Sequence, residues 1–241
     1  MKKIPSIVFV LWLSVFSLSS CTGEFEPIDP AIQTPEENPD DNGTGGNSSG
    51  DYWPMAINNQ WVYKLDGEVQ EPMKISSTVS IDSRTYYKYD NFLGVSDGGS
   101  NFIGTNLTRK TNGVYFVRVS AIIPGTPTIT ISPLEVVVLK DYLEVNQMWS
   151  QNLSQTTTIE GQPPIVTAVE IDGKILARNI TVIIGAITYT QVIHVEVIQT
   201  TQGIINKNEY WFAKDIGLIK YSNFIGGTIN SVYEIQSYTL N

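Results

Sequence analysis

The chain has 241 residues with 24 acidic and 15 basic side chains, a formal net charge of −9, one histidine and one cysteine. A single cysteine excludes a disulfide within the chain, and one histidine leaves too few nitrogen and sulfur ligands for a zinc site. An acidic chain without a basic stripe is not expected to bind nucleic acid. We therefore predict no metal, no cofactor and no nucleic-acid partner.

Residues 1–20 have the pattern of a secretory signal peptide. Lys2 and Lys3 precede the apolar run IPSIVFVLWLSVFSL, and small residues follow it before Cys21. A positive start, an apolar stretch and a small-residue cleavage zone are typical of such signals. The run is also shorter than the roughly 20 apolar residues that a membrane-spanning helix needs.

The end of this segment, Leu18-Ser19-Ser20-Cys21, resembles the lipobox of bacterial lipoproteins. The resemblance implies that Cys21 carries fatty acyl groups, palmitate among them, and becomes the first residue of the mature chain. A lone cysteine is otherwise most often a buried apolar side chain or an odd thiol. Because two or three acyl chains hold a protein firmly on a membrane, we predict Cys21 as the lipidation site and membrane anchor.

Residues 21–50 have the composition of a disordered linker, with four prolines, seven acids and the run NGTGGNSSG. Such a segment cannot bury enough apolar surface to offset the entropy of ordering it. Glu24 and Glu26 are similar to the surface-export signals of Bacteroidota lipoproteins. That likeness implies an outer-membrane lipoprotein exposed at the cell surface.

Residues 51–241 are predicted to form an all-β domain. Ile, Val, Thr and Tyr dominate this region and no stretch keeps a 3.6-residue period. Turn sequences such as KDIG and IGG separate short apolar runs, and short connections join antiparallel neighbours. We expect antiparallel meander sheets arranged as a sandwich or a half-barrel.

A faint internal repeat divides this domain. INNQW at residues 57–61 and VNQMW at 145–149 each place an asparagine three residues before a tryptophan. The pattern favours two similar halves, 51–140 and 141–241, that arose by duplication. The alternative is that tryptophan simply recurs where strands begin.

Two longer stretches, YWPMAINNQWVYKLDG near the start of the domain and YWFAKDIGLIKY near its end, carry a second resemblance. They are similar to paired signatures of envelope lipoproteins of Bacteroidota. The resemblance covers residues 52–240, implies an all-β lipoprotein domain and brings no catalytic residues. Asn58 or Asn59 replaces the usual glycine before the first tryptophan, and asparagine tolerates a positive φ.

The sequence offers little for an enzyme. In VIHVEVI, strand alternation places His194 and Glu196 on one face. A catalytic interpretation would use His194 as a base beside a serine, but no G-x-S-x-G motif accompanies it. We therefore expect a solvated strand face and no enzymatic activity. Glycoside hydrolysis by two carboxylates stays open, because it depends on their separation in space.

Aromatic side chains are the candidate ligand contacts. Alternation in RTYYKYDNF places Tyr87 and Tyr89 on one face, where they could stack on a sugar. The alternative is that they belong to the core or to a cross-strand aromatic ladder. Trp61, Trp149 and Trp211 lie in apolar strands and are predicted to be core residues.

Together these features predict a lipoprotein of the cell envelope whose domain is a non-enzymatic binding or structural module. The alternative functions are a lipid-handling half-barrel carrier and a glycan-binding or glycan-acting surface protein. The partners would be a glycan, a lipid or another envelope protein. A large apolar-lined trough would favour lipid handling.

Overall fold

The computed structural model describes residues 46–93, 95–96 and 103–241, and this part of the chain contains strands and turns but no helix. Accordingly, no helix of the described residues is long and apolar enough to cross a membrane. The predicted signal peptide, Cys21 and the linker up to residue 45 lie outside the described residues.

The described chain forms fifteen strands. They are β1 Gln60–Leu65, β2 Glu68–Val69, β3 Met73–Ile81, β4 Arg84–Tyr89, β5 Asn91–Phe92, β6 Val95–Ser96, β7 Ile103–Thr111, β8 Val114–Ile123, β9 Ile129–Lys140, β10 Met148–Ile159, β11 Ile165–Ile184, β12 Ile187–Thr201, β13 Ile204–Ala213, β14 Gly217–Ile225 and β15 Thr228–Thr239.

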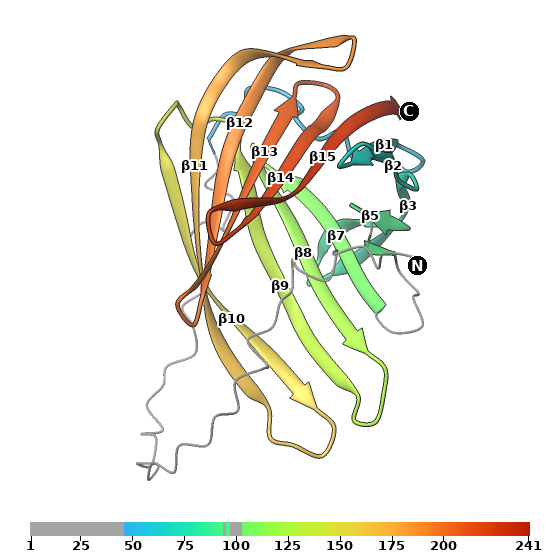
Figure 1. Ribbon diagram of the computed structural model, residues 1–241, viewed down its shortest axis with the longest axis vertical. Helices are drawn as coiled ribbons and strands as arrows, with labels where there is room; N and C mark the ends of the chain where they lie inside the picture. The colour runs from blue at the N-terminus through green and yellow to red at the C-terminus, as the bar shows by residue number, and fades with distance from the viewer. Residues whose placement is uncertain (1–45, 94, 97–102) are drawn as a thin grey trace.

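Twelve of these strands form one closed antiparallel barrel (Figure 1). From β7 to β15 each strand pairs with the next in the chain, β4, β3 and β1 continue the sheet, and β15 pairs with β1 to close it. β2 extends β1 as a short hairpin, and β5 and β6 form a separate one. The predicted all-β antiparallel meander is confirmed, and the sheet is of the barrel type and fully closed.

Both predicted halves contribute to this single barrel. Residues 51–140 join residues 141–241 where Thr157 of β10 pairs with Ile131 of β9, and again where β15 pairs with β1. Their inward side chains belong to one hydrophobic cluster. The two segments therefore do not fold around separate cores, and an origin by duplication stays a prediction.

The repeated motif nevertheless has the same local geometry at both places. Asn58 and Asn146 have φ angles of 72° and 70°. The backbone N–H of Asn58 donates to Ile75 O at 2.8 Å, and that of Asn146 donates to Ile175 O at 2.8 Å. In each case the isoleucine N–H donates back to the residue after the asparagine. The matching bonds fix how the chain enters β1 and β10.

The core lies inside the barrel because the strands alternate apolar inward and polar outward residues. Trp61 and Trp149 are buried in it, as predicted. The Trp61 indole donates to Ile216 O at 2.7 Å, and the Trp149 ring covers Gly173, where a Cβ would lie 2.1 Å from the ring. Trp211 differs from the prediction: it is half-buried on the outer face, stacked on His194 with ring centroids 4.0 Å apart.

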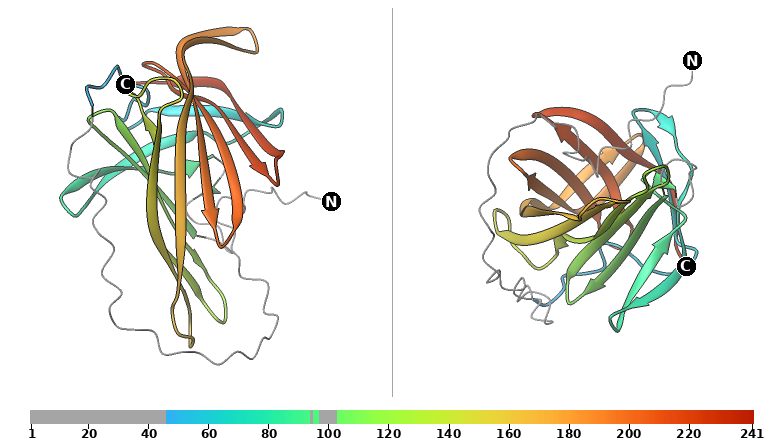
Figure 2. Two further views of the ribbon diagram at one scale, coloured as in Figure 1. Left: turned by 90° about the vertical axis from the view of Figure 1, so that its left-hand side faces the viewer. Right: turned by 90° about the horizontal axis from the view of Figure 1, so that it is seen from below.

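The two ends of the barrel differ. The upper end of Figure 1 carries the long β11–β12 hairpin, which bends over where Asn179 and Gln191 take positive φ and the strand register shifts. The β8–β9, β10–β11, β12–β13 and β14–β15 turns lie at the opposite, lower end of their hairpins, where the first two extend farthest down and the β12–β13 and β14–β15 turns end nearer the middle of the molecule (Figure 2).

Candidate functional site

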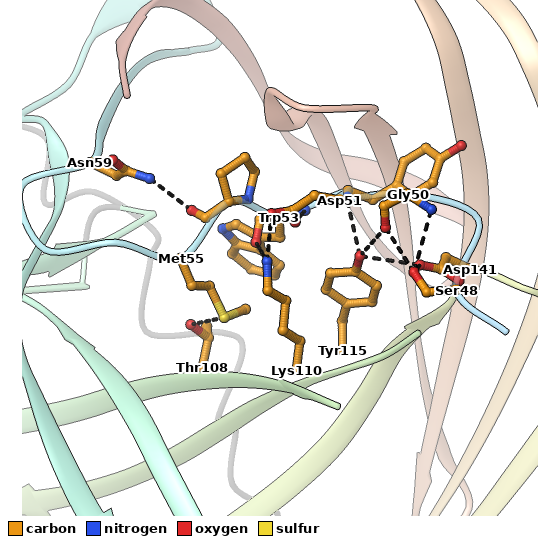
Figure 3. Close-up of polar contacts among 12 residues, drawn as sticks. Ser48, Gly50, Asp51, Trp53, Met55, Asn59, Thr108, Lys110, Tyr115 and Asp141 are labelled. Atoms are coloured by element: carbon orange, nitrogen blue, oxygen red, sulfur yellow. Dashed lines mark hydrogen bonds and ion pairs between the residues drawn. The ribbon is translucent and has the colours of Figure 1, made fainter. Parts of the chain in front are cut away.

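The upper end of the barrel is closed by the segment of residues 46–59, which we call the plug (Figure 3). Trp53 of the plug packs against Phe92 and Phe212, with ring centroids 6.1 and 5.5 Å apart. The backbone N–H of Asp215, in the β13–β14 turn, donates to Asp51 O at 2.6 Å. The plug therefore contacts strands on different sides of the barrel.

One buried carboxylate fixes the start of the plug. Asp141, in the turn after β9, is fully buried and accepts hydrogen bonds from Ser48 Oγ at 2.6 Å and from Ser49 N at 3.1 Å. Arg178 of β11 donates to Asp141 O at 2.6 Å and to Ser49 Oγ at 3.2 Å. The sequence placed these serines in the linker, whereas here they are bound to the barrel.

Tyr115 of β8 binds the next residues of the plug. Its hydroxyl accepts from the Tyr52 N–H at 3.0 Å and lies 3.1 Å from Gly50 O and 3.2 Å from Asp141 Oδ2. Burial raises the pKa of Tyr115 well above its usual value, against the bond from Tyr52, and the nearby Asp141 charge raises it further. The phenol therefore stays protonated and can donate to one of these oxygens.

Below the plug, the inner face changes from apolar to polar towards the lower end. Directly paired residues of an antiparallel sheet share a face. A first inward row consists of Val195, Tyr210, Tyr221 and Tyr233. The next row down consists of Val197, Asn208, Asn223 and Ser231. The third consists of Gln151, Ile171, Gln199 and Asn206.

These rows bring six side-chain amides to one inner surface, which we call the amide wall. Its members are Gln151, Gln155, Gln199, Asn206, Asn208 and Asn223. Thr167 and Thr201 add hydroxyl groups at the same inward positions. Among the described inward residues of these lower rows, none is charged. The wall therefore offers neutral donors and acceptors.

Part of the amide wall is already hydrogen-bonded. Asn208 Oδ1 accepts from Tyr221 Oη at 2.8 Å and from Asn223 Nδ2 at 3.0 Å. Burial raises the pKa of Tyr221 well above its usual value, so this phenol is a neutral donor. The lower members Gln155, Gln199 and Asn206 are only half-buried, which shows that solvent reaches the wall at this end. Within the described chain, the side chains of Gln155 and Asn206 bond to no other residue.

The single histidine lies on the outer face, as predicted, with Glu196 beside it. His194 Nε2 contacts Glu209 Oε2 at 3.1 Å, and Lys207 Nζ lies 2.7 Å from Glu209 Oε1 and 3.7 Å from Glu196 Oε2. Burial lowers the pKa of His194, although the bond to Glu209 opposes this shift. Lysine-bridged carboxylates on an outer strand face form a row of cross-strand ion pairs.

The predicted ligand contacts lie on the inner face. Tyr89 is buried, its hydroxyl 3.1 Å from Thr108 Oγ1 and its ring edge-on to Phe92. Tyr87 shares its face and is half-buried, so ligand contact at Tyr87 stays a prediction. The predicted lipidation site, Cys21, lies outside the described residues. Among the described residues, no group of three or more His, Cys, Asp or Glu side chains is placed to hold a metal ion.

The amide wall was not predicted from the sequence. Its signal is visible in retrospect as amides two or four residues apart, in SQNLSQ and in NKNEYW. Alternation places such residues on one face of a strand, but it does not tell which face is inward. Strand pairing decides this, because Asn208 lies opposite the inward Val197.

No protein-family model and no curated protein matches the sequence. A solved structure from Parabacteroides distasonis, described as a lipoprotein, is similar with a TM-score of 0.49 and 14% identity over 79% of this chain and 99% of its own. A protein of Bacteroides fragilis, described as exported and with a YmcC-like fold, has a TM-score of 0.43 and 10% identity over 79% of this chain and 100% of its own. These distant likenesses assign no family, and the fold described above rests on its own strand pairings.

Proposed function

We propose that the protein is a cell-envelope lipoprotein anchored through Cys21, and that its barrel is a non-enzymatic binding module for an uncharged, hydroxyl-rich ligand such as a glycan. The amide wall carries this proposal. Amides and hydroxyls both donate and accept hydrogen bonds, as sugar hydroxyls do. The half-exposed members of the wall would exchange bonds with water for bonds with the ligand.

The same surface argues against an acyl chain as the ligand. Placing hydrocarbon against amide groups would remove their water without replacing its hydrogen bonds, which costs about 1–3 kcal/mol per group. A lipid carrier is expected to have an apolar-lined trough. The inner rows here contain Asn208, Gln199 and Asn206, so they do not form such a trough. Between the two alternatives considered from the sequence, the inner wall favours the glycan.

Lipidation has a direct test. Mass spectrometry of the native protein should find acyl groups on Cys21, and the protein should enter the detergent phase on phase partitioning. A Cys21→Ala variant should retain its signal peptide and lose the acyl mass. An unmodified thiol at Cys21 in the native protein would refute the anchor.

Ligand binding is tested by screening the detergent-solubilised native protein on an array of neutral glycans. On strand β10, Gln155 faces inward and Asn152 faces outward. For a glycan that binds, Gln155→Leu should weaken binding about fivefold or more, since a lost hydrogen bond costs about 1 kcal/mol. Asn152→Leu should leave binding unchanged. Absence of binding across the array, or equal loss in both variants, would refute the proposal.

A further inference from the structure

The lower end of the barrel exposes an unusual set of apolar side chains. We call the following six residues the isoleucine rim: Ile122, Ile165, Val166, Ile204, Ile205 and Ile229. Each is between 42% and 67% exposed, and together they flank the β8–β9, β10–β11, β12–β13 and β14–β15 turns. Every hairpin at this end therefore carries at least one solvent-exposed aliphatic side chain beside its turn.

These four turns also carry little charge. Residues 124–128, 160–164, 202–203 and 226–227 contain one charged side chain, Glu160. At the upper end, the β9–β10 turn contains Asp141 and Glu144 and the β13–β14 turn contains Lys214 and Asp215. The β11–β12 turn at that end is uncharged and is flanked by the exposed Ile183 and Ile187. Surface turns are normally polar, and gathered exposed apolar residues mark an interaction site.

The arrangement of the rim fits a bilayer rather than a protein partner. Its side chains stand on four separate turns at the same end of the barrel, of which the β8–β9 and β10–β11 turns extend farthest (Figures 1 and 2). Protein interfaces are enriched in Tyr, Trp and Arg at their centre, and the rim has none of these. Separate aliphatic tips can each enter the acyl region beneath the lipid head groups without a complementary surface.

The chain between the anchor and the barrel is long enough for this contact. The described chain begins at Gly46, against Tyr142 at the upper end. From Cys21 to Gly46 the chain can span on the order of 80 Å. The 12 residues of β10, which run from the upper to the lower end, cover about 40 Å. A membrane that holds Cys21 can therefore also contact the rim.

We propose that the isoleucine rim docks on the lipid bilayer that holds the anchor, so that the barrel sits with its lower end against the membrane. This inference rests on the proposed lipid anchor at Cys21. In this orientation the amide wall opens towards the lipid head groups. A sugar carried on a membrane lipid would then lie directly in front of it.

The test measures depth in the bilayer with spin labels on the native lipidated protein in vesicles of phosphatidylethanolamine and phosphatidylglycerol. Because Cys21 is the chain's only cysteine and would be acylated, an introduced cysteine is labelled uniquely. The variants are Ile205→Cys and Val166→Cys at the rim, and Ile183→Cys on the β11–β12 hairpin as control. Ile183 is 71% exposed at the opposite end.

Labels at 205 and 166 should be more accessible to oxygen than to a water-soluble nickel complex, and the label at 183 should show the reverse. In a further variant with Ile204→Ser and Ile205→Ser, the label at 166 should become less accessible to oxygen and more accessible to the nickel complex. The circular dichroism spectrum of the barrel should stay unchanged. Aqueous readings at both rim positions, or a buried reading at 183, would overturn the proposal.

Failure of the anchor gives a different result. Intact mass of the same sample reports acylation at Cys21, and a free thiol there would take up a second label. In that case flotation of the unlabelled protein with vesicles decides the rim alone. Flotation that the two serine substitutions abolish supports docking, and absence of flotation overturns it.

Discussion

At the scale of single residues, the plug depends on a few buried polar groups. Asp141 is fully buried, and its side-chain oxygens accept hydrogen bonds from Ser48 and Ser49. The Tyr115 hydroxyl also lies within hydrogen-bond distance of Asp141 Oδ2. A buried donor that loses its partner costs more than the net gain of the bond it made. Small changes at these positions should therefore loosen the plug.

We predict that Tyr115→Phe lowers the free energy of unfolding by about 1–3 kcal/mol, because it leaves the buried Tyr52 N–H without its acceptor. Urea unfolding followed by circular dichroism measures this change. Tyr238→Phe, at a tyrosine that is 41% exposed on β15, should change stability by less than about 0.5 kcal/mol. Equal stability of Tyr115→Phe and the unmodified protein would contradict the bonding described for the plug.

At the scale of elements, two asparagines determine how strands begin. Asn58 and Asn146 enter β1 and β10 with positive φ, a conformation that most side chains adopt only at a cost. Asparagine and glycine tolerate it, which explains why asparagine serves where a glycine was expected before Trp61. The bond from each asparagine N–H to an isoleucine carbonyl then sets the register.

Substitution at Asn146 separates backbone strain from loss of the side chain. Asn146→Ala should lower the free energy of unfolding by about 1 kcal/mol, since alanine is strained at this φ of 70°. Asn146→Gly removes the same amide but fits the backbone, so it should stay within about 0.5 kcal/mol of the unmodified protein. Thermal or urea unfolding of the pair decides the point, and equal losses would attribute the effect to the side chain instead.

At the scale of the whole molecule, closure of the sheet places a set of tyrosines in one interior. Tyr63, Tyr89 and Tyr221 are buried and Tyr210 is half-buried, and burial raises the pKa of each above its usual value. Burial raises the pKa of Tyr233 to about 12. Pairing of β15 with β1 closes the ring and maintains this enclosure.

Alkaline pH should therefore unfold the barrel. In the unfolded chain tyrosines release protons near pH 10, whereas these folded tyrosines retain them, so stability is unaffected below pH 10 and falls as the pH rises from about 10 towards 12. Phenolate absorbance and circular dichroism should change together in this window. The same titration in concentrated urea should show phenols ionising near pH 10. Ionisation of all tyrosines near pH 10 with an intact circular dichroism spectrum would contradict the enclosed interior.

Much of the fold is determined by the sequence itself. Strand type follows from the β-branched and aromatic composition, turns follow from glycine, asparagine and aspartate, and the burial of Trp61 and Trp149 follows from the apolar strands around them. These properties depend on residues close together in the chain. The outer position of His194 and Glu196 also agrees with the solvated strand face that the local sequence predicted. The signal peptide and lipobox at residues 1–21 stay a prediction.

Only the tertiary structure decided the rest. Closure depends on β15 meeting β1, about 170 residues apart in the chain, and a local pattern cannot specify such a pairing. The amide wall likewise exists because strands β10 to β14 align their alternating residues in register, so that amides that look like surface residues one strand at a time face one interior. The prediction that Trp211 belongs to the core was wrong because alternation within one strand defines two faces but not which of them is inside. Only the pairing with neighbouring strands shows this.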